Sequence, residues 1–248
     1  ERLDAANYRP VAILRADFKI AALVLTGRLT PHLATVTEPT QTGFVNGRYI
    51  HENCLRLRDG MKHAADVDAD AVVLSTDFEK AYDLVQHAVL FEVASTVGGD
   101  GYASWLRTLY VGHVRFIVVN GVTSQPVELR SGVPQGCTHA CQAFLIFIEG
   151  LAHRIRGTAA IEGLIMPDDS VMLDIRYADD CQYLVKASSL ELLIDIIDEW
   201  CTEVGMRLNA RKCECAFWGS RRDDHKVWHP SQYGSTSTRG GCPKAIRT

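Results

Sequence analysis

Residues 171–185 read VMLDIRYADDCQYLV, two apolar runs on either side of Ala178-Asp179-Asp180. The runs Val171–Tyr177 and Gln182–Val185 are short and rich in β-branched and aromatic side chains, which is typical of strands. They predict a β-hairpin with two acids at its tip. A further apolar run, Ala71–Thr76, indicates a buried strand that ends at Asp77. If the three strands share one sheet, the three carboxylates meet at one end of it.

Carboxylates that meet in this way have a specific chemistry. Like charges repel unless a cation neutralises them, and hard oxygen ligands favour Mg²⁺ or Mn²⁺. Two such ions serve in-line phosphoryl or nucleotidyl transfer, where one activates the attacking hydroxyl and the other steadies the leaving pyrophosphate. Taken singly, each acid also has an ordinary interpretation, Asp179-Asp180 as a hairpin loop and Asp77 as a strand-end cap.

The rest of the pattern alternates helices and strands. Helical spacing predicts five helices before the hairpin, the first of which stops near Pro31. A sixth opens with a capping box, Ser188-x-x-Glu191, and ends at Gly205. Asn120-Gly121 supplies the positive-φ residues of a tight turn and predicts a second hairpin. The five helices are Asp17–Leu33, Arg48–Ala65, Gln86–Val97, Tyr102–Tyr110 and Thr138–Arg156; the second hairpin pairs Val114–Val119 with Val127–Leu129; the sixth helix buries Leu193, Ile196, Ile197, Trp200 and Val204; short strands follow at Met206–Leu208 and Glu214–Trp218.

The order of these elements indicates the fold class. Strand 71–77, helix 86–97, strand pair 171–186 and helix 188–204 together resemble a split βαβ, ferredoxin-like unit. We therefore expect an α+β protein with helices on one face of the sheet. The segments in between are expected to form a second lobe.

Composition places the chain of 248 residues, 47% hydrophobic and 23% charged, among globular proteins. We find no apolar run long enough to span a membrane and no secretory signal, so we expect no membrane partner and a nuclear or intracellular location. The net charge of −4 argues against nucleic acid, but the acidity is concentrated in residues 49–205, between mildly basic ends. Cys213-x-Cys215 with His225 and His229 only weakly resembles a zinc site, because the cysteines are one residue too close.

Several boxes together resemble the reverse transcriptases of non-LTR (LINE-type) retrotransposons. YADD at residues 177–180 is similar to their YxDD box, and DFEKAYD at 77–83 is similar to their DFEKAFD box. The further boxes are NYRPV at 7–11, QTGFVNGR at 41–48, VNG at 119–121, GVPQGC at 132–137, IEG at 161–163 and GMRLNARK at 205–212. They follow the family order across residues 7–212, which makes the resemblance specific.

The resemblance implies a polymerase right-hand fold with a ferredoxin-like palm, a fingers lobe and no thumb. The expected boundaries are fingers at 1–70, palm at 71–98, a fingers or palm hairpin insertion at 99–135, palm with the YADD hairpin at 136–218, and a polar basic tail, expected to be disordered, at 219–248. The start at Glu1 rather than Met suggests a fragment of something longer.

The resemblance also implies a set of catalytic acids. Asp77 and Asp179 would bind two Mg²⁺ ions, or Mn²⁺, helped by the Phe78 carbonyl, and Asp180 would be less directly engaged. Lys212 matches a lysine that would protonate the departing pyrophosphate, although as a bare feature it is a turn lysine.

Other implied residues would contact the nucleotide. Tyr82 falls at the steric-gate position, where its ring would clash with a ribose 2′-hydroxyl. Gln135 and Gly136 would line the incoming nucleotide, since glycine allows close backbone approach. Arg9 would contact the nucleotide or its triphosphate, and Arg48 lies in a similar lobe; either is equally consistent with a solvated surface arginine.

The leading hypothesis is an RNA-directed DNA polymerase domain that extends a DNA primer on an RNA template with deoxynucleotides. The alternatives are a group II intron or retron-type enzyme, an RNA-dependent RNA polymerase, and a decayed, inactive fragment that at most binds RNA. One departure from the family concerns the helix after Cys137. The family usually has Pro-Leu-Ser-Pro there, and this chain has Thr138-His139-Ala140-Cys141.

Overall fold

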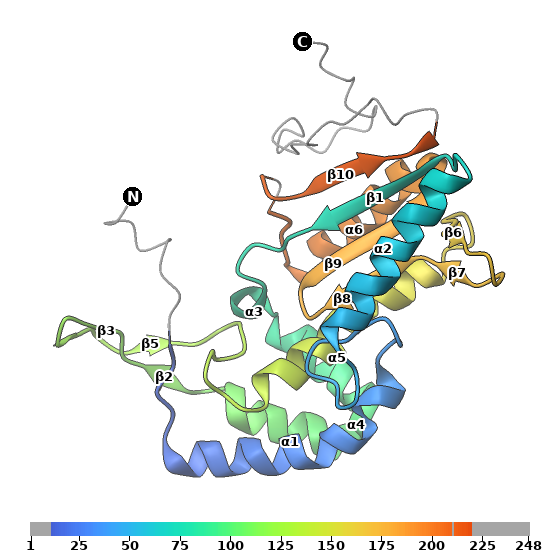
Figure 1. Ribbon diagram of the computed structural model, residues 1–248. Helices are drawn as coiled ribbons and strands as arrows, with labels where there is room; N and C mark the ends of the chain where they lie inside the picture. Colours follow the sequence, from blue (N-terminus) through green and yellow to red (C-terminus); the bar gives the residue numbers. More distant parts are fainter. Residues whose placement is uncertain (1–10, 210, 220–248) are drawn as a thin grey trace. The chain divides into compact units, whose positions relative to one another are not determined.

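The computed structural model describes residues 11–209 and 211–219, which form two compact units (Figure 1). Unit 1 comprises Glu1–Thr37 and Lys80–Phe147, and unit 2 comprises Glu38–Glu79 and Ile148–Thr248, each within the described ranges. Helix α5 (Ala140–Arg156) crosses the boundary, so its first half belongs to unit 1 and its second half to unit 2.

Unit 2 contains a four-stranded antiparallel sheet. Its strands are β1 (Ala71–Thr76), β8 (Asp174–Tyr177), β9 (Asp180–Lys186) and β10 (Glu214–Phe217). Their order across the sheet is β10-β1-β9-β8, with antiparallel pairing throughout. Counted along the chain, the strands therefore lie fourth, first, third and second, as a ferredoxin-like unit requires. The predicted strands 71–76 and 182–185 are confirmed.

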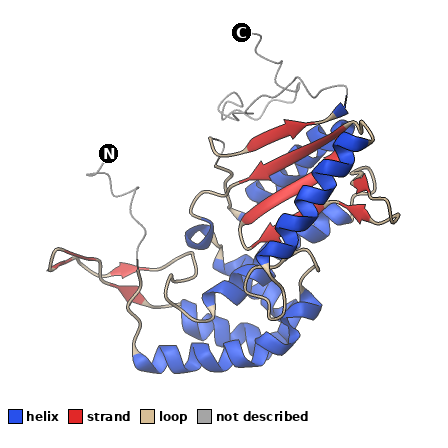
Figure 2. Ribbon diagram, in the orientation of Figure 1, coloured by secondary structure: helices blue, strands red, loops and turns tan. Residues whose placement is uncertain are grey.

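Helices cover both faces of this sheet, which corrects the prediction of one covered face. Helix α2 (Ile50–Asp66) lies on one face, and α6 (Leu190–Val204) lies on the other (Figure 2). The α2 packing is close, because a Cβ added at Gly60 would lie 2.7 Å from Leu184 Cδ2. β1 is accordingly buried on consecutive residues rather than alternate ones, as a strand covered on both faces must be.

The start of α6 also differs from the prediction. A 3₁₀ turn, η2 (Ala187–Ser189), precedes the helix, and Ser189 rather than Ser188 is its N-cap. Ser189 makes no side-chain capping bond, and its hydroxyl instead accepts the Glu162 N–H at 3.0 Å. The capping box predicted at Ser188 is therefore wrong: Ser188 lies inside the 3₁₀ turn, and Ser189, which takes the N-cap position, bonds a neighbouring loop instead. The predicted end is confirmed: Gly205 has φ 73° and ψ 18°, the left-handed cap conformation.

The segment after α6 forms less strand than predicted. Met206–Leu208 makes only one isolated bridge, between Leu208 and Phe78, whereas β10 pairs with β1 over four residues. The remaining small sheet of unit 2 pairs β6 (Leu164–Ile165) with β7 (Val171–Met172). Residues 171–177 therefore form two strands, of which only β8 joins the main sheet.

Unit 1 is mainly helical. It contains α1 (Ala16–Val36), α3 (Ala81–Leu84) and α4 (His87–Tyr110), which breaks at Gly99 (φ 76°, ψ 173°). The two helices predicted on either side of Gly98-Gly99 are thus joined across a kink. No helix within the described ranges is long and apolar enough to cross a membrane.

Helix α1 extends past Pro31 and past its predicted end at Leu33. Its last turn continues to Val36 and buries Leu33 completely. The Leu33 carbonyl accepts both the N–H and the hydroxyl of Thr37, at 3.1 and 2.8 Å. Burial and capping together offset the cost of an internal proline, about 3 kcal/mol.

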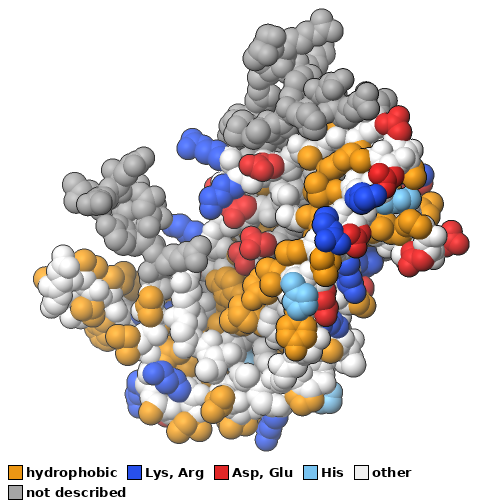
Figure 3. All heavy atoms as spheres, in the orientation of Figure 1, with side chains coloured by type: hydrophobic (Ala, Val, Ile, Leu, Met, Phe, Trp, Pro, Cys, Tyr) orange, Lys and Arg blue, Asp and Glu red, His pale blue; other side chains and the backbone are white. Residues whose placement is uncertain are grey.

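The hairpin predicted at Asn120-Gly121 is present in unit 1. β3 (Val118–Val119) pairs with β4 (Val122–Thr123), and both turn residues have positive φ, 51° and 80°. β2 (Val114–Arg115) pairs with β5 (Val127–Glu128) at its base. Hydrophobic side chains gather over this hairpin on the left of Figure 3. The exposed ones are Val114, Phe116, Ile117, Val118, Val119, Val122 and Val127.

Candidate functional site

The strand order brings Asp77 and the YADD turn to the same end of the unit 2 sheet. Thr76, the last residue of β1, pairs with Cys181, and Tyr177 pairs with Asp180 at the turn. Extending the β1–β9 register by one residue sets Asp77 opposite Asp180. Residues directly opposite in an antiparallel pair project from the same face. The prediction that these strands share one sheet end is therefore confirmed.

A backbone segment after α6 runs beside Asp77. The Asp77 carbonyl accepts the Asn209 N–H at 2.7 Å, and the Arg207 carbonyl accepts the Glu79 N–H at 2.8 Å. This brings Lys212 Nζ to 3.6 Å from Asp77 Oδ2. The Asp77 side chain is 29% exposed, so one predicted acid is reachable from solvent and adjoins the predicted lysine.

The described residues contain no group of three or more His, Cys, Asp or Glu side chains arranged to hold a metal ion. The described residues give no support to the weak resemblance to a zinc site. Cys213 and Cys215 are buried free thiols, and His225 and His229 lie outside the described residues. The three predicted acids, Asp77, Asp179 and Asp180, are therefore not arranged as such a group in the described structure.

The YADD turn has an unusual backbone conformation. Ala178, the first of its two turn residues, has φ 55°. A left-handed residue at this place is normally glycine, and another residue costs roughly 1–2 kcal/mol. Both backbone polar groups of Ala178 contact one side chain, that of Gln41. Gln41 Oε1 accepts the Ala178 N–H at 2.8 Å, and Gln41 Nε2 donates to the Ala178 carbonyl at 3.3 Å.

The loop that carries Gln41 packs closely against the hairpin. Gln41 is fully buried, and its Oε1 also accepts the Gly43 N–H at 3.0 Å. A Cβ at Gly43 would lie 2.6 Å from Ala178 N, so only glycine fits there. Arg48 donates to the carbonyls of Glu38 and Gln41, at 2.6 and 2.9 Å. Arg48 is thus a partly buried brace of this loop rather than a solvated arginine.

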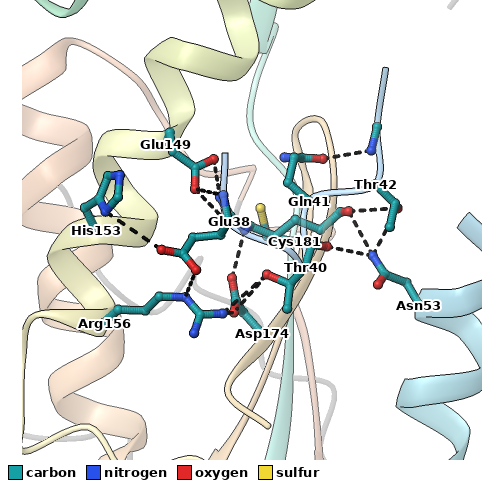
Figure 4. Close-up of polar contacts among 12 residues, drawn as sticks. Glu38, Thr40, Gln41, Thr42, Asn53, Glu149, His153, Arg156, Asp174 and Cys181 are labelled. Atoms are coloured by element: carbon teal, nitrogen blue, oxygen red, sulfur yellow. Dashed lines mark hydrogen bonds and ion pairs between the residues drawn. The ribbon is translucent and has the colours of Figure 1, made fainter. Parts of the chain in front are cut away.

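Buried charges lie in strand β8 of the same hairpin and beside it, among them Asp174 and Glu149 (Figure 4). Arg176 of β8 bonds Glu149 of α5 through two nitrogens, at 2.9 and 3.2 Å, and its Nε lies 2.8 Å from Asp174 Oδ2. All three side chains are at most 4% exposed. Burial alone would lower the pKa of Arg176, but the two carboxylates outweigh burial and raise the pKa above its ordinary value. Arg176 therefore remains charged inside unit 2.

An outer layer of polar side chains completes this cluster. Arg156 pairs with Asp174 and, at 3.4 Å, with Glu38, and the Glu38 N–H donates to Glu149 Oε1 at 2.8 Å. Asn53 of α2 donates to the Arg176 and Thr40 carbonyls, at 3.0 and 2.8 Å. Helices α2 and α5, strand β8 and the loop 38–44 are thereby tied together within unit 2.

Of the residues predicted to contact the nucleotide, Tyr82, Gln135 and Gly136 lie in unit 1, and Arg48 lies in unit 2. The Tyr82 ring stacks on Phe144, with centroids 4.4 Å apart and planes 19° apart. The Tyr82 carbonyl accepts the Val133 N–H at 2.8 Å. The Gln135 carbonyl accepts the Ala12 N–H at 2.8 Å, and Gly136 has φ 108°. Unit 1 thus holds Tyr82 beside the segment that carries Gln135 and Gly136, while Arg9 lies outside the described residues.

The departure from the family at residues 138–141 has a structural role. His139 is fully buried, with Nε2 2.7 Å from the Tyr102 hydroxyl and Nδ1 3.3 Å from Thr26 Oγ1. Thr26 donates its own proton to the Ala22 carbonyl, so its oxygen accepts from His139 Nδ1–H and Nε2 accepts from Tyr102. Burial lowers the pKa of His139 to about 4, and the ring is neutral near pH 7.

Sequence reasoning missed the roles of Gln41 and Arg176. Gln41 lay inside a recognised box, but nothing in that box indicates a partner 137 residues away. The sequence does contain a signal for Arg176. Asp174 and Arg176 are two residues apart in an otherwise apolar strand and so share one face, and charges on the buried face of a strand require partners. His139 was noticed only as a departure from the family pattern.

A ferredoxin-like antiparallel sheet, with one acid after its first strand and two at its hairpin, defines the palm of right-hand polymerases. The family model of reverse transcriptase (RNA-dependent DNA polymerase) matches residues 3–237, and the chain therefore belongs to that family. This confirms the recognition made from the sequence boxes.

Individual relatives agree with this assignment. The chain is 33% identical over 177 residues, 70% of its length, to the transposon TX1 uncharacterized 149 kDa protein of Xenopus laevis. It is 25% identical over 220 residues, 85% of its length, to the RNA-directed DNA polymerase from mobile element jockey of Drosophila funebris. It spans only 13% and 23% of these two relatives.

Solved structures support the fold. Apo telomerase from Candida tropicalis superposes with a TM-score of 0.58 at 10% identity, covering 81% of this chain and 37% of that one. A likeness at this identity is a likeness of fold, and it confirms the predicted right-hand polymerase architecture.

Proposed function

We propose that this chain is the catalytic portion of an RNA-directed DNA polymerase of the non-LTR type. It would add deoxynucleotides to the 3′-end of a DNA primer on an RNA template. The observation that carries the proposal is the placement of Asp77 beside the YADD turn at one end of the sheet, in a chain that belongs to the reverse transcriptase family. The fingers and palm boundaries given above remain part of this proposal.

Asp77 and Asp179 would hold two divalent ions, with the Phe78 carbonyl and a lesser part for Asp180. The donor set fits Mg²⁺ or Mn²⁺, since it consists of hard oxygen atoms alone. When bound, such ions activate the primer hydroxyl and neutralise charge on the pyrophosphate. Lys212, 3.6 Å from Asp77, would give its proton to the departing pyrophosphate.

Unit 1 would supply the nucleotide contacts. The stacking of Tyr82 on Phe144 supports a gate role, because a fixed ring excludes a 2′-hydroxyl better than a mobile one. Gln135 and Gly136 would line the nucleotide, and Arg9 would contact its phosphates. Comparing deoxy- and ribonucleotide incorporation by Tyr82→Ala tests this role, and unchanged discrimination would contradict it.

The proposal as a whole is tested by primer extension with the purified chain, an annealed RNA template and DNA primer, and Mg²⁺ or Mn²⁺. Asp179→Asn should lower nucleotide incorporation by at least about 10²-fold, since several kcal/mol of charge stabilisation are lost. Asp195→Asn, the same change at an exposed α6 position, is the matched control. Incorporation that survives Asp179→Asn would refute the metal assignment. Salt-sensitive RNA binding without any incorporation would favour the inactive-fragment alternative.

A further inference from the structure

We infer that Gln41 is a positioning residue for the catalytic hairpin: its side-chain amide holds Ala178 in the left-handed conformation that presents Asp179. This inference rests on the proposed function of Asp179 and extends it to a residue in a different segment of unit 2.

The contact is specific in its chemistry. An amide side chain has one acceptor and one donor end, and Gln41 uses both ends on a single residue, the Ala178 N–H at 2.8 Å and the Ala178 carbonyl at 3.3 Å. Such a pair of bonds fixes the orientation of the peptide groups on both sides of Ala178. One of those peptide groups leads directly into Asp179.

The turn requires such support. Ala178 is buried and has φ 55°, although it lacks the freedom of glycine. The opposing β-strands pair Tyr177 with Asp180 at the ends of the turn, and Ala178 lies outside that pairing. Gln41 therefore contributes hydrogen bonds where the ladder has none, and these offset a conformational cost of roughly 1–2 kcal/mol.

The loop around Gln41 is itself held in place. Its backbone bridges to β8 at Arg176, Arg48 donates to its carbonyl, and Gly43 lies against Ala178 with no room for a side chain. The buried ion pairs of Arg176 lie in the strand that enters the turn. The support is thus part of the core of unit 2.

The first experiment measures the hold directly, without polymerase activity. Amide hydrogen exchange by NMR should show slow exchange at Ala178 in the wild-type chain. In Gln41→Met, which keeps the volume and removes both polar atoms, that exchange should be at least about 10-fold faster, the equivalent of one lost hydrogen bond. Gln142→Met is the matched control, a buried glutamine of unit 1. Equal exchange at Ala178 in the wild type and Gln41→Met would overturn the inference.

The second experiment measures the consequence for Asp179. Mn²⁺ titration by calorimetry should give an affinity about 10-fold weaker for Gln41→Met than for the wild type or Gln142→Met. Adding Ala178→Gly to Gln41→Met should recover part of that loss, because glycine adopts positive φ without cost. A merely structural role for Gln41 predicts no such rescue. Gly43→Ala, whose Cβ would lie 2.6 Å from Ala178 N and 3.1 Å from Gln41 Oε1, displaces the same turn and should weaken Mn²⁺ binding even if Gln41→Met fails to fold.

The two proposals fail in different ways. If the wild-type chain binds no Mn²⁺, or binds Mn²⁺ that Asp179→Asn does not remove, the metal function fails. The exchange measurement alone then decides whether Gln41 holds the turn. If Mn²⁺ binds at Asp179 with equal affinity in the wild type and Gln41→Met, and in Gly43→Ala, the positioning role is refuted while the metal function stands.

Discussion

The two units of this chain bury polar side chains in opposite ways. Unit 2 buries charges: Arg176, in strand β8 of the YADD hairpin, pairs with Glu149 and Asp174. Unit 1 buries a neutral group: His139 shares hydrogen bonds with Tyr102 and Thr26. A buried charge depends on every partner being present, whereas a neutral network depends on its protonation state. The two units should therefore respond differently to substitution and to pH.

The largest effect is expected from breaking the charged cluster. Arg176→Met removes the cation that Glu149 and Asp174 share and leaves Asp174 with Arg156 alone, so it should lower the free energy of unfolding by about 3–5 kcal/mol. Urea unfolding followed by circular dichroism measures this. Replacing Glu149 and Asp174 together with Arg176 by apolar residues should restore much of the stability. A loss below about 1 kcal/mol in Arg176→Met would mean that unit 2 does not depend on the buried pair.

The neutral network should respond to acid. His139 has a pKa of about 4 in the folded chain against 6.5 in the unfolded one, so the unfolded state takes up a proton first. Its contribution is fully present above pH 6.5 and is lost as the pH falls from 6.5 to 4, by up to about 3 kcal/mol. Denaturation curves at stepped pH measure the slope, and His139→Gln should remove that part of it. An unchanged slope in His139→Gln would show that other groups titrate.

A smaller effect is expected from one partner of the neutral network. Tyr102→Phe removes the hydroxyl that donates to His139 Nε2 and should cost about 1–2 kcal/mol, since it leaves a buried nitrogen unpaired. The comparison with Arg176→Met tests whether charge makes the difference between the units. Equal losses in the two variants would contradict it.

The smallest effect is expected at the surface. Arg154 pairs with Glu203 and Glu199, at 2.6 and 3.2 Å, but the two glutamates are 59% and 65% exposed. Arg154→Ala should therefore cost less than about 1 kcal/mol. This variant is also the control for Arg176→Met, since both remove an arginine with two carboxylate partners. A loss above about 2 kcal/mol would mean that exposure does not weaken the pair.

The elements that depend on local spacing were predictable. The apolar run of β1, the hairpin around Ala178-Asp179-Asp180, and the Asn120-Gly121 turn each follow from side chains a few residues apart. Spacing placed Asp77 and the YADD acids at strand ends, but their meeting was predicted only on the condition that the strands share one sheet, which the antiparallel pairing of β1 with β9 supplies. The boxes made the family recognisable without any knowledge of the fold.

Other elements were decided by contacts that spacing does not encode. Helix α1 passes Pro31 because Leu33 is buried beyond it, and the expected capping serine of α6 gives way to Ser189, which bonds Glu162 instead. Helix α2 covers a face of the sheet that was expected to be open. In each case a tertiary contact outweighs a local preference of about 1–3 kcal/mol.

The residues of the candidate site also differ in whether the sequence alone identifies them. Asp77, Asp179 and Asp180 are recognisable as residues, since their chemistry and position in strands can be read from the chain alone. How Asp179 is presented depends on Gln41, which lies 138 positions earlier and touches the turn only once the loop has packed on β8. Hydrogen bonds act over about 3 Å, whatever the separation along the chain, so the packed structure alone determines which side chain supports the turn.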